Sequence, residues 1–290
     1  MYKVYMHTQE QVLFENPEQR PIVLGLTKVS DYPNYIYSAH KHEDRCEVFY
    51  ISKGHATFII DSKTYPVKTG DIIVCDKGVV HHEEGPKDGE FEMWVCPIGN
   101  FQLKGREPNH VLWPGMPPVF SAGSKGRDIV ACNEIILDAC LNITKHSNIR
   151  GQGVAILMLS IVDEIISQAK EEKRPVVVKP MIQDVINYID DNYAEQISLA
   201  SLAKKFYVSA DYLSHAIKKE TGMSPISYLI NRRLGEGQKY LLLTDYPIST
   251  IAEMVGYPNI NHFSNAFKKK LGISPGQFRI KYNIFGHAKG

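Results

Sequence analysis

A repeat in the last third of the chain is the sequence feature that most constrains its fold. Residues 199–225, LASLAKKFYVSADYLSHAIKKETGMSP, align with residues 248–275, ISTIAEMVGYPNINHFSNAFKKKLGISP. Each copy has two short stretches of helical apolar spacing separated by a turn, then a lysine pair and a closing Gly-X-Ser-Pro. One such copy would fit any helical hairpin. Two copies that agree in core positions, lysines and stop signal predict two helix-turn-helix units.

Small capping residues set the expected helix ends, with N-caps at Ser198, Ser209 and Ser224 and a left-handed stop at Gly222. Pro225 then opens a longer helix that is expected to run to about Leu243. Gly235 and Gly237 lie inside this helix, and each costs about 1 kcal/mol relative to alanine. We therefore expect the helix to bend there.

Residues 181–282 resemble the DNA-binding domain of the arabinose-operon regulator (AraC/XylS) family. The resemblance depends most on IAEMVGY, HFSNAFKKKLGISPGQFR and the preceding LLLTD. It implies that one long helix joins the two units and that the second helix of each unit enters a major groove of double-stranded DNA, where bases are distinguishable. By this resemblance the base-reading residues are Asp211, His215, Asn261 and Asn265. Phosphate contacts are expected from Lys218, Lys219, Lys268, Lys269 and Arg279.

The charge distribution agrees with a polyanionic partner. Residues 197–290 hold 13 of the 33 Lys and Arg residues but only 5 of the 32 Asp and Glu residues. That segment therefore carries a net charge of +8, and the rest of the chain carries −7. A basic segment attached to an acidic remainder favours nucleic acid as the ligand of the basic part.

The N-terminal part has the pattern of a small β-structure. Short β-branched or aromatic stretches, separated by turn residues, occupy residues 22–29, 46–51, 56–60 and 71–75. Residues 99–126 are rich in Pro and Gly and are expected to form a loop. Many short strands at near-regular spacing predict a sandwich or barrel.

A second pattern falls on these strands: His40-X-His42, Glu47, Gly54, Gly70, Gly78 and His81. It resembles the two cupin motifs and covers about residues 22–98 of a double-stranded β-barrel. In cupins these three histidines and the glutamate hold a divalent metal, and the donor set suits Fe, Mn, Ni or Zn. Asp76 and Gly85 depart from the motif, where proline and asparagine are usual. Three roles remain open for the four residues: metal ligands, polar lining of an effector pocket, and structure.

A small effector in the barrel, with a sugar favoured, is expected to meet an aromatic wall. The candidates for this wall are Tyr35, Tyr37, Phe49, Phe58 and Trp94. Regulators with this DNA-binding domain commonly use such a barrel to sense a small molecule without metal. An aromatic face opposite polar donors suits a sugar ring.

Two helices are expected at about residues 128–146 and 150–172. Ile129, Cys132, Ile136, Ala139 and Ile143 share one face, and Leu157, Ile161, Ile165 and Ala169 share another. By resemblance these helices pair two subunits into a homodimer; the alternative is that they only cover the barrel. The five cysteines lack CxxC spacing and are interpreted as reduced packing residues: Cys46, Cys75, Cys96, Cys132 and Cys140.

The expected fold class is α+β multidomain, with a cupin-like double-stranded β-barrel followed by an all-α tandem helix-turn-helix domain. The expected boundaries are residues 1–125 for the sensor, 126–174 for the dimerisation helices, 175–180 for a linker and 181–290 for DNA binding.

The sequence favours an effector-responsive transcriptional regulator. The family resemblance implies that it acts as an activator and recruits RNA polymerase. No secretory signal or membrane span is apparent, so a cytoplasmic location is expected. A metal-dependent cupin enzyme with an accessory DNA-binding domain and an architectural DNA binder without a ligand are the alternatives. No motif for any other catalysis is present.

Overall fold

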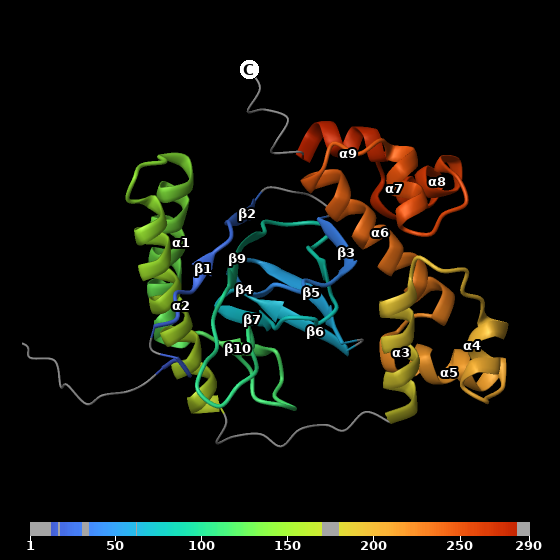
Figure 1. Ribbon diagram of the computed structural model, residues 1–290, viewed down its shortest axis with the longest axis horizontal. Coiled ribbons are helices and arrows are strands. Elements are labelled where there is room, and N and C mark those ends of the chain that lie inside the picture. The colour runs from blue at the N-terminus through green and yellow to red at the C-terminus, as the bar shows by residue number, and fades with distance from the viewer. Residues whose placement is uncertain (1–12, 17, 31–34, 62, 170–179, 283–290) are drawn as a thin grey trace, which may run out of the picture.

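The computed structural model describes residues 13–16, 18–30, 35–61, 63–169 and 180–282. A β-rich N-terminal domain lies at the centre of the molecule, with two helices on one side and a helical C-terminal domain on the other (Figure 1). Of the expected linker, residues 175–179 lie outside the described residues, and residue 180 begins the next helix.

Two antiparallel sheets make up the N-terminal domain. The larger sheet has the order β1 (Ile22–Val23), β9 (Glu92–Gly99), β4 (Arg45–Lys53), β7 (Asp71–Cys75) and β10 (Val119–Ser121), with β2 (Thr27–Ser30) also paired to β9. The smaller has the order β3 (Ile36–His40), β8 (His81–Glu84), β5 (His55–Ile60) and β6 (Lys63–Lys68). The strand expected at residues 22–29 is therefore two strands. The loop expected at residues 99–126 contains β10, which pairs with β7.

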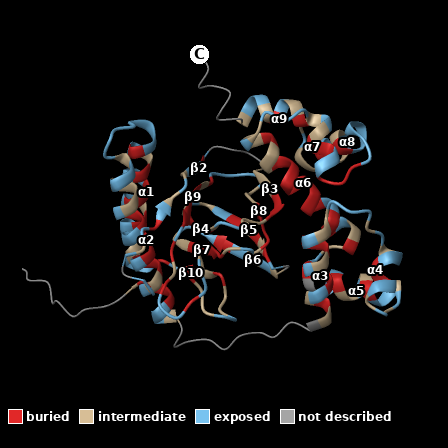
Figure 2. Ribbon diagram, viewed as in Figure 1, coloured by how far each residue is buried: buried red, intermediate tan, exposed pale blue. Residues whose placement is uncertain are grey.

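Alternation along β4 assigns its side chains to two cores. Phe49 and Ile51 belong to the core between the sheets, whereas Val48 and Tyr50 belong to a core that includes residues of the helices outside the larger sheet. Successive residues of a strand point to opposite faces, so both cores can be built from one strand. In Figure 2 buried residues mark both the strands of the sheets and the helices α1 and α2.

The helices outside the larger sheet are α1 (Gly126–Leu141) and α2 (Ser147–Ala169), which follow the short η1 (Gly123–Lys125). Two details of the expected apolar faces are wrong. Ile143 lies beyond the end of α1 and is 84% exposed, and Leu157 points away from the core and is 50% exposed. Cys140 is also exposed, so only the other four cysteines are packing residues; all five are free thiols.

The C-terminal domain consists of helices α3 (Pro180–Asn192), α4 (Leu199–Lys205), α5 (Ala210–Thr221), α6 (Pro225–Leu243), α7 (Ile248–Met254), α8 (Ile260–Leu271) and α9 (Pro275–Tyr282). The expected caps are confirmed. Ser198, Ser209 and Ser224 each accept a backbone N–H as N-caps, and Gly222 ends α5 with φ of 73°. Helices α4 and α5 form one helix-turn-helix unit, and α7 and α8 form the other, with α6 between them (Figure 1).

The bend expected in the long helix is wrong, because α6 is one continuous helix from Pro225 to Leu243. The two glycines instead allow close packing. A Cβ on Gly237 would lie 2.8 Å from the ring of Phe263, and a Cβ on Gly235 would overlap the carbonyl oxygen of Ala39 in β3. The propensity cost of these glycines is therefore offset by contacts that a larger residue could not make.

Stability of the C-terminal domain is expected to depend on the ionisation of Asp190 in α3. This carboxylate accepts hydrogen bonds from Tyr228 Oη at 2.9 and 3.0 Å and lies 3.7 Å from Arg232 Nε. Burial raises the pKa of Asp190 to about 7, although Arg232 acts to lower it. Because the folded-state pKa exceeds the unfolded value, the native state binds the additional proton, and stability falls as pH rises from about 4 to about 7.

We therefore expect wild-type protein to lose about 2.5 kcal/mol more stability than Asp190→Asn between pH 5 and pH 8. Urea unfolding followed by circular dichroism at both pH values measures the difference. Parallel losses in the two proteins would mean that Asp190 is ionised throughout this range.

Candidate DNA-binding surface and sensor site

The two second helices of the repeat, α5 and α8, present matching exposed faces. Leu213 and Ile217 in α5, and Phe263 and Phe267 in α8, are fully buried. Because these residues are four apart, each helix buries one stripe and leaves the opposite stripe to solvent. The burial pattern is the same at the corresponding positions from residue 211 to 219 and from residue 261 to 269, and it differs only at the helix ends.

All four expected base-reading residues lie on these exposed stripes: Asp211, His215, Asn261 and Asn265. The α5 N-cap is Ser209, and the α8 N-cap is Asn259, whose side chain accepts the backbone N–H groups of Asn261 and His262. The caps therefore fix the first turn of each helix and leave these four side chains available to a ligand.

The expected phosphate-binding lysines, Lys218, Lys219, Lys268 and Lys269, are exposed in the last turns of α5 and α8. Arg279 on α9 is partly buried, and its Nη2 donates to the carbonyl oxygen of Tyr246 at 2.6 Å. That bond ties α9 to the loop before α7. Within the part of the chain that the structure describes, the four lysines make no such bond, whereas Arg279 makes one.

The His–Glu cluster inside the N-terminal domain is the second site, and its members are His40, His42, Glu47 and His81. One potential ligand atom from each residue lies within 4.8 Å of the others. His40 and His81 are direct cross-strand partners on β3 and β8. Glu47 on β4 bridges the two sheets, since its oxygens lie 3.3 Å from His42 Nε2 and 3.2 Å from His81 Nε2.

Backbone carbonyls orient two of these imidazoles. His40 Nδ1 donates to Ser38 O, and His81 Nδ1 donates to Val79 O, each at 3.0 Å. A carbonyl oxygen can only accept, so Nδ1 carries a proton in both rings. Nε2 of His40 is then available to a ligand, whereas Nε2 of His81 donates to Glu47 at 3.2 Å, so a metal would have to take the place of that proton. This second contact is the arrangement that metal-binding histidines ordinarily have.

Ionisation within the cluster also suits a cation. Burial raises the pKa of Glu47, but hydrogen bonds from His42 and His81 outweigh it and hold the pKa well below the usual range. Burial and the neighbouring His81 and His42 lower the pKa of His40 well below its ordinary value. An ionised carboxylate beside a neutral imidazole is the state that coordinates a divalent ion. Burial lowers the pKa of His81, but Cys75 and Glu47 outweigh it and raise the pKa well above its ordinary value, so this imidazole has to release a proton when a metal binds.

The aromatic residues expected around this site divide between the two cores. Phe49 packs 5.7 Å from His81, and Tyr37 packs edge-on to His40 at 4.1 Å, both between ring centroids. Tyr35 and Phe58 belong to the core between the sheets. Trp94 was expected here and is not: it faces the opposite side of β9, within the core that includes α1 and α2 residues.

Glu83 is a residue of this site that the sequence analysis missed. It lies on the same face of β8 as His81, is 2% exposed, and has Oε1 3.8 Å from His81 Nε2. Tyr35 Oη donates to its other oxygen at 2.9 Å. Burial raises the pKa of Glu83 to about 8. The two-residue spacing from His81 was the signal that could have identified it.

The two departures from the cupin motif have structural explanations. Asp76 accepts backbone N–H groups from Val111 and Leu112 at 2.7 and 3.1 Å, which holds the following loop against the larger sheet. Gly85 packs tightly, because a Cβ there would lie 3.1 Å from the Cβ of Tyr35. Neither position contributes to the His–Glu cluster, so neither departure weakens it.

Comparison with known proteins identifies both domains. A helix-turn-helix domain model matches residues 202–281, and a cupin domain model matches residues 32–96. The chain is 31% identical over 281 residues to an uncharacterized HTH-type transcriptional regulator, YdiP, of Escherichia coli K12, covering 94% of this chain and 92% of that protein. It is 24% identical to the Escherichia coli arabinose operon regulatory protein, over 78% of this chain and 77% of the relative.

The lactose operon transcription activator of Staphylococcus xylosus is also 24% identical, over 98% of this chain and 99% of its own length. The fold is similar to that of ToxT from Vibrio cholerae O395, with a TM-score of 0.53 at 12% identity, covering 93% of this chain and all of that one. These likenesses confirm the expected fold class.

Fold and sites together define a DNA-binding transcriptional regulator with a cupin domain at its N-terminal side. The chain belongs to the AraC family of helix-turn-helix transcriptional regulators. Within the described residues, no helix has both the length and the apolar character needed to cross a bilayer.

Proposed function

We propose that the chain is an effector-responsive transcriptional activator whose His–Glu cluster binds a divalent transition metal. The single observation that carries this proposal is the convergence of three imidazoles and one carboxylate within 4.8 Å, with two rings oriented by backbone carbonyls. Such N/O ligand sets suit Zn, Fe, Ni or Mn. In this proposal residues 1–125 sense, 126–174 dimerise and 181–290 bind DNA in the cytoplasm, where the protein contacts RNA polymerase.

Binding of a sugar and binding of a metal at this site would change the thermal stability of the protein under different conditions. Thermal unfolding of the full chain, with Zn²⁺, Mn²⁺, Ni²⁺ or a panel of sugars, tests both. A metal at 100 times its Kd should stabilise the protein by about 2.7 kcal/mol, and a chelator should reverse this. Stabilisation by a sugar that survives chelation, with no effect of any metal, would contradict the metal proposal.

The enzyme alternative is not favoured by any observation of the site. The relatives of this chain that match over most of their length are named as a transcriptional regulator and a transcription activator. The donor set would equally suit a metallocupin enzyme, so the alternative is tested directly: catalytic turnover that disappears in His42→Ala would support it.

Base reading and phosphate binding should separate in two variants of α8. Asn265→Ala is expected to lose about tenfold in preference for one base, since a bidentate side chain contributes about 1–3 kcal/mol of discrimination. Lys268→Ala is expected to weaken binding to all sequences alike. Binding to a set of singly substituted operators by fluorescence anisotropy measures both. Equal profiles would contradict the assignment of these two contacts.

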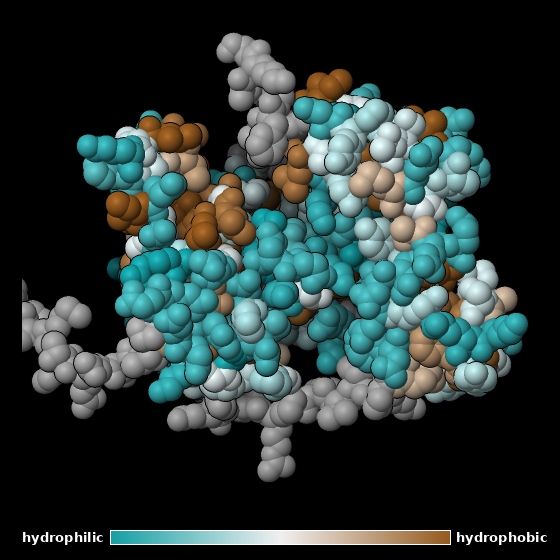
Figure 3. All heavy atoms as spheres, in the orientation of Figure 1, coloured by the Kyte–Doolittle hydropathy of each residue, from teal (hydrophilic) through white to brown (hydrophobic). Residues whose placement is uncertain are grey.

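We propose dimerisation through α1 and α2, supported by the apolar side chains that they leave exposed. Leu141, Ile143, Ile149, Ile156 and Leu157 are all at least 38% exposed. Figure 3 shows apolar surface gathered over α1, α2 and β1. Contiguous exposed apolar surface of this kind usually marks an interface.

Ile149→Glu is therefore expected to convert a dimer into a monomer, because a carboxylate at the interface would lose its hydration. Light scattering after size-exclusion chromatography measures the mass. A wild-type protein that is monomeric at micromolar concentration, or a variant that remains dimeric, would contradict the proposal.

A further inference from the structure

The C-terminal domain covers the edge of the strand that carries His40. β3 is an end strand of the smaller sheet, and its exposed edge would otherwise leave backbone groups unpaired. The Gln238 amide on α6 satisfies them as a neighbouring strand would. Its oxygen accepts from Ser38 N at 2.8 Å, and its nitrogen donates to Ile36 O at 3.0 Å. Gln238 is fully buried.

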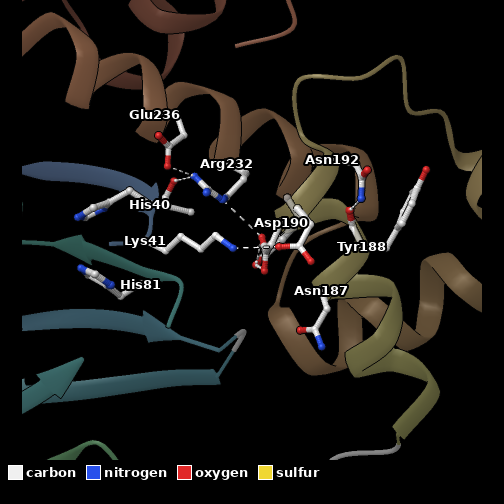
Figure 4. Close-up of polar contacts among 12 residues, drawn as sticks. His40, Lys41, His81, Asn187, Tyr188, Asp190, Asn192, Arg232 and Glu236 are labelled. Carbon is white, nitrogen blue, oxygen red and sulfur yellow. Dashed lines mark hydrogen bonds and ion pairs between the residues drawn. The ribbon is translucent and has the colours of Figure 1, made fainter. Parts of the chain in front are cut away.

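Arg232 and Gly235 extend this contact along α6. The Arg232 guanidinium, 1% exposed, donates to Glu236 at 2.6 Å and reaches Ala39 O at 3.5 Å (Figure 4). Gly235 lies so close to β3 that any side chain would overlap the carbonyl oxygen of Ala39. A buried arginine and glutamine are costly unless paired, so these residues are fitted to the docked arrangement.

Two ion pairs join the same strands to the rest of the C-terminal domain. Lys41, between His40 and His42, donates to Asp191 at 2.9 Å (Figure 4). Glu84 on β8 accepts from Lys270 of α8 at 3.3 Å and from His82 at 2.7 Å. On β8, His81 faces the cluster, whereas Glu84 faces the second helix-turn-helix unit. β3 and β8, which supply His40 and His81, are thus the strands on which the DNA-binding domain docks, and His42 follows two residues after the end of β3.

From this geometry we infer that metal binding at the His–Glu cluster and docking of α6 on β3 stabilise one another. The inference rests on the proposed metal site and states how metal binding there would affect the DNA-binding domain. In the docked arrangement Gln238 and Arg232 fix the backbone of β3, so His40 is already placed beside the other ligands. A metal that requires this placement selects the docked arrangement, and DNA affinity then depends on the metal through the same equilibrium.

Gly235→Ala tests the inference in the full chain. Alanine favours the helical state of α6, so the C-terminal domain should fold, but its Cβ cannot approach Ala39. Gly151→Ala is the matched control, because Gly151 lies within α2, away from the face that carries Ile149 and Ile156, and a Cβ there would meet nothing within 4 Å. Zn²⁺ affinity is measured by competition with a chromophoric chelator, and DNA affinity by anisotropy at fixed salt with and without Zn²⁺.

We expect Gly235→Ala to bind Zn²⁺ about tenfold more weakly than wild type and to lose the Zn²⁺ dependence of its DNA affinity. Gly151→Ala should match wild type in both. Faster hydrogen exchange of the Ser38 amide in Gly235→Ala would report the loss of docking directly. If this variant fails to fold, Gln238→Ala, which leaves Ser38 N–H and Ile36 C=O unpaired, takes its place with the same expectations.

The outcomes separate the two proposals. Wild-type protein that binds Zn²⁺, with a docking variant whose Zn²⁺ affinity stays within twofold of wild type, would overturn this inference and leave the metal site standing. Wild-type protein that binds neither Zn²⁺, Mn²⁺ nor Ni²⁺ would overturn both.

Discussion

Replacing His42 with alanine is expected to weaken divalent-metal binding by at least about 100-fold. Even residues that only orient a metal ligand contribute about 10- to 100-fold to affinity, and His42 is a proposed ligand itself. Its Nε2 lies 3.3 Å from Glu47 and its side chain is only 11% exposed, so circular dichroism must first show that the variant keeps the barrel folded. Competition with a chromophoric chelator measures the affinity.

His55→Ala is the matched control for this variant. His55 lies at the exposed start of β5 and has no part in the cluster. It should bind metal as wild type does. Equal affinity of His42→Ala and His55→Ala would show that the metal binds elsewhere, and the proposed site would then have to be abandoned.

DNA affinity is expected to fall about 500-fold between 50 and 200 mM monovalent salt. Each phosphate contact releases counterions and contributes about −0.9 to the slope of log K against log salt, so the five proposed contacts give a slope of about −4.5. Titration of an operator fragment by anisotropy at several salt concentrations gives the slope. A dimer on paired half-sites would give a steeper one.

Lys268→Ala should make this slope shallower by about one. Lys145→Ala is the control and should leave the slope unchanged, because Lys145 is an exposed lysine between α1 and α2. A wild-type slope shallower than about −2 would mean that most of the proposed contacts are not made. The Arg279 contact is the first to doubt in that case, since its guanidinium already bonds to Tyr246.

Local signals predicted the helices of the repeat because their ends depend on neighbouring residues. Ser198 and Ser209 act as N-caps, and Gly222 adopts the left-handed conformation, as expected. The His–Glu cluster was also predictable in part, since His40 and His42 are two residues apart. The placement of Trp94 was not, because one strand of a two-core domain gives no local indication of which face meets which core.

Contacts between domains were the least predictable feature. Arg232 and Gln238 are polar residues in a helix, and by sequence alone such residues belong on a solvated surface. The glycines beside them looked like points of bending. Both interpretations fail because a strand some 200 positions earlier in the chain packs against α6, and the periodicity of the helix contains no trace of that partner.

The fitted contact between α6 and β3 limits how this regulator can be recombined with others. A chimaera that joins residues 181–290 to an unrelated receptor module would leave a cluster of buried polar groups without acceptors or donors. Such a hybrid would have to replace the inner stripe of α6 along with the receptor. For biosensor engineering, the natural unit of exchange is therefore the receptor together with that stripe, rather than either half alone.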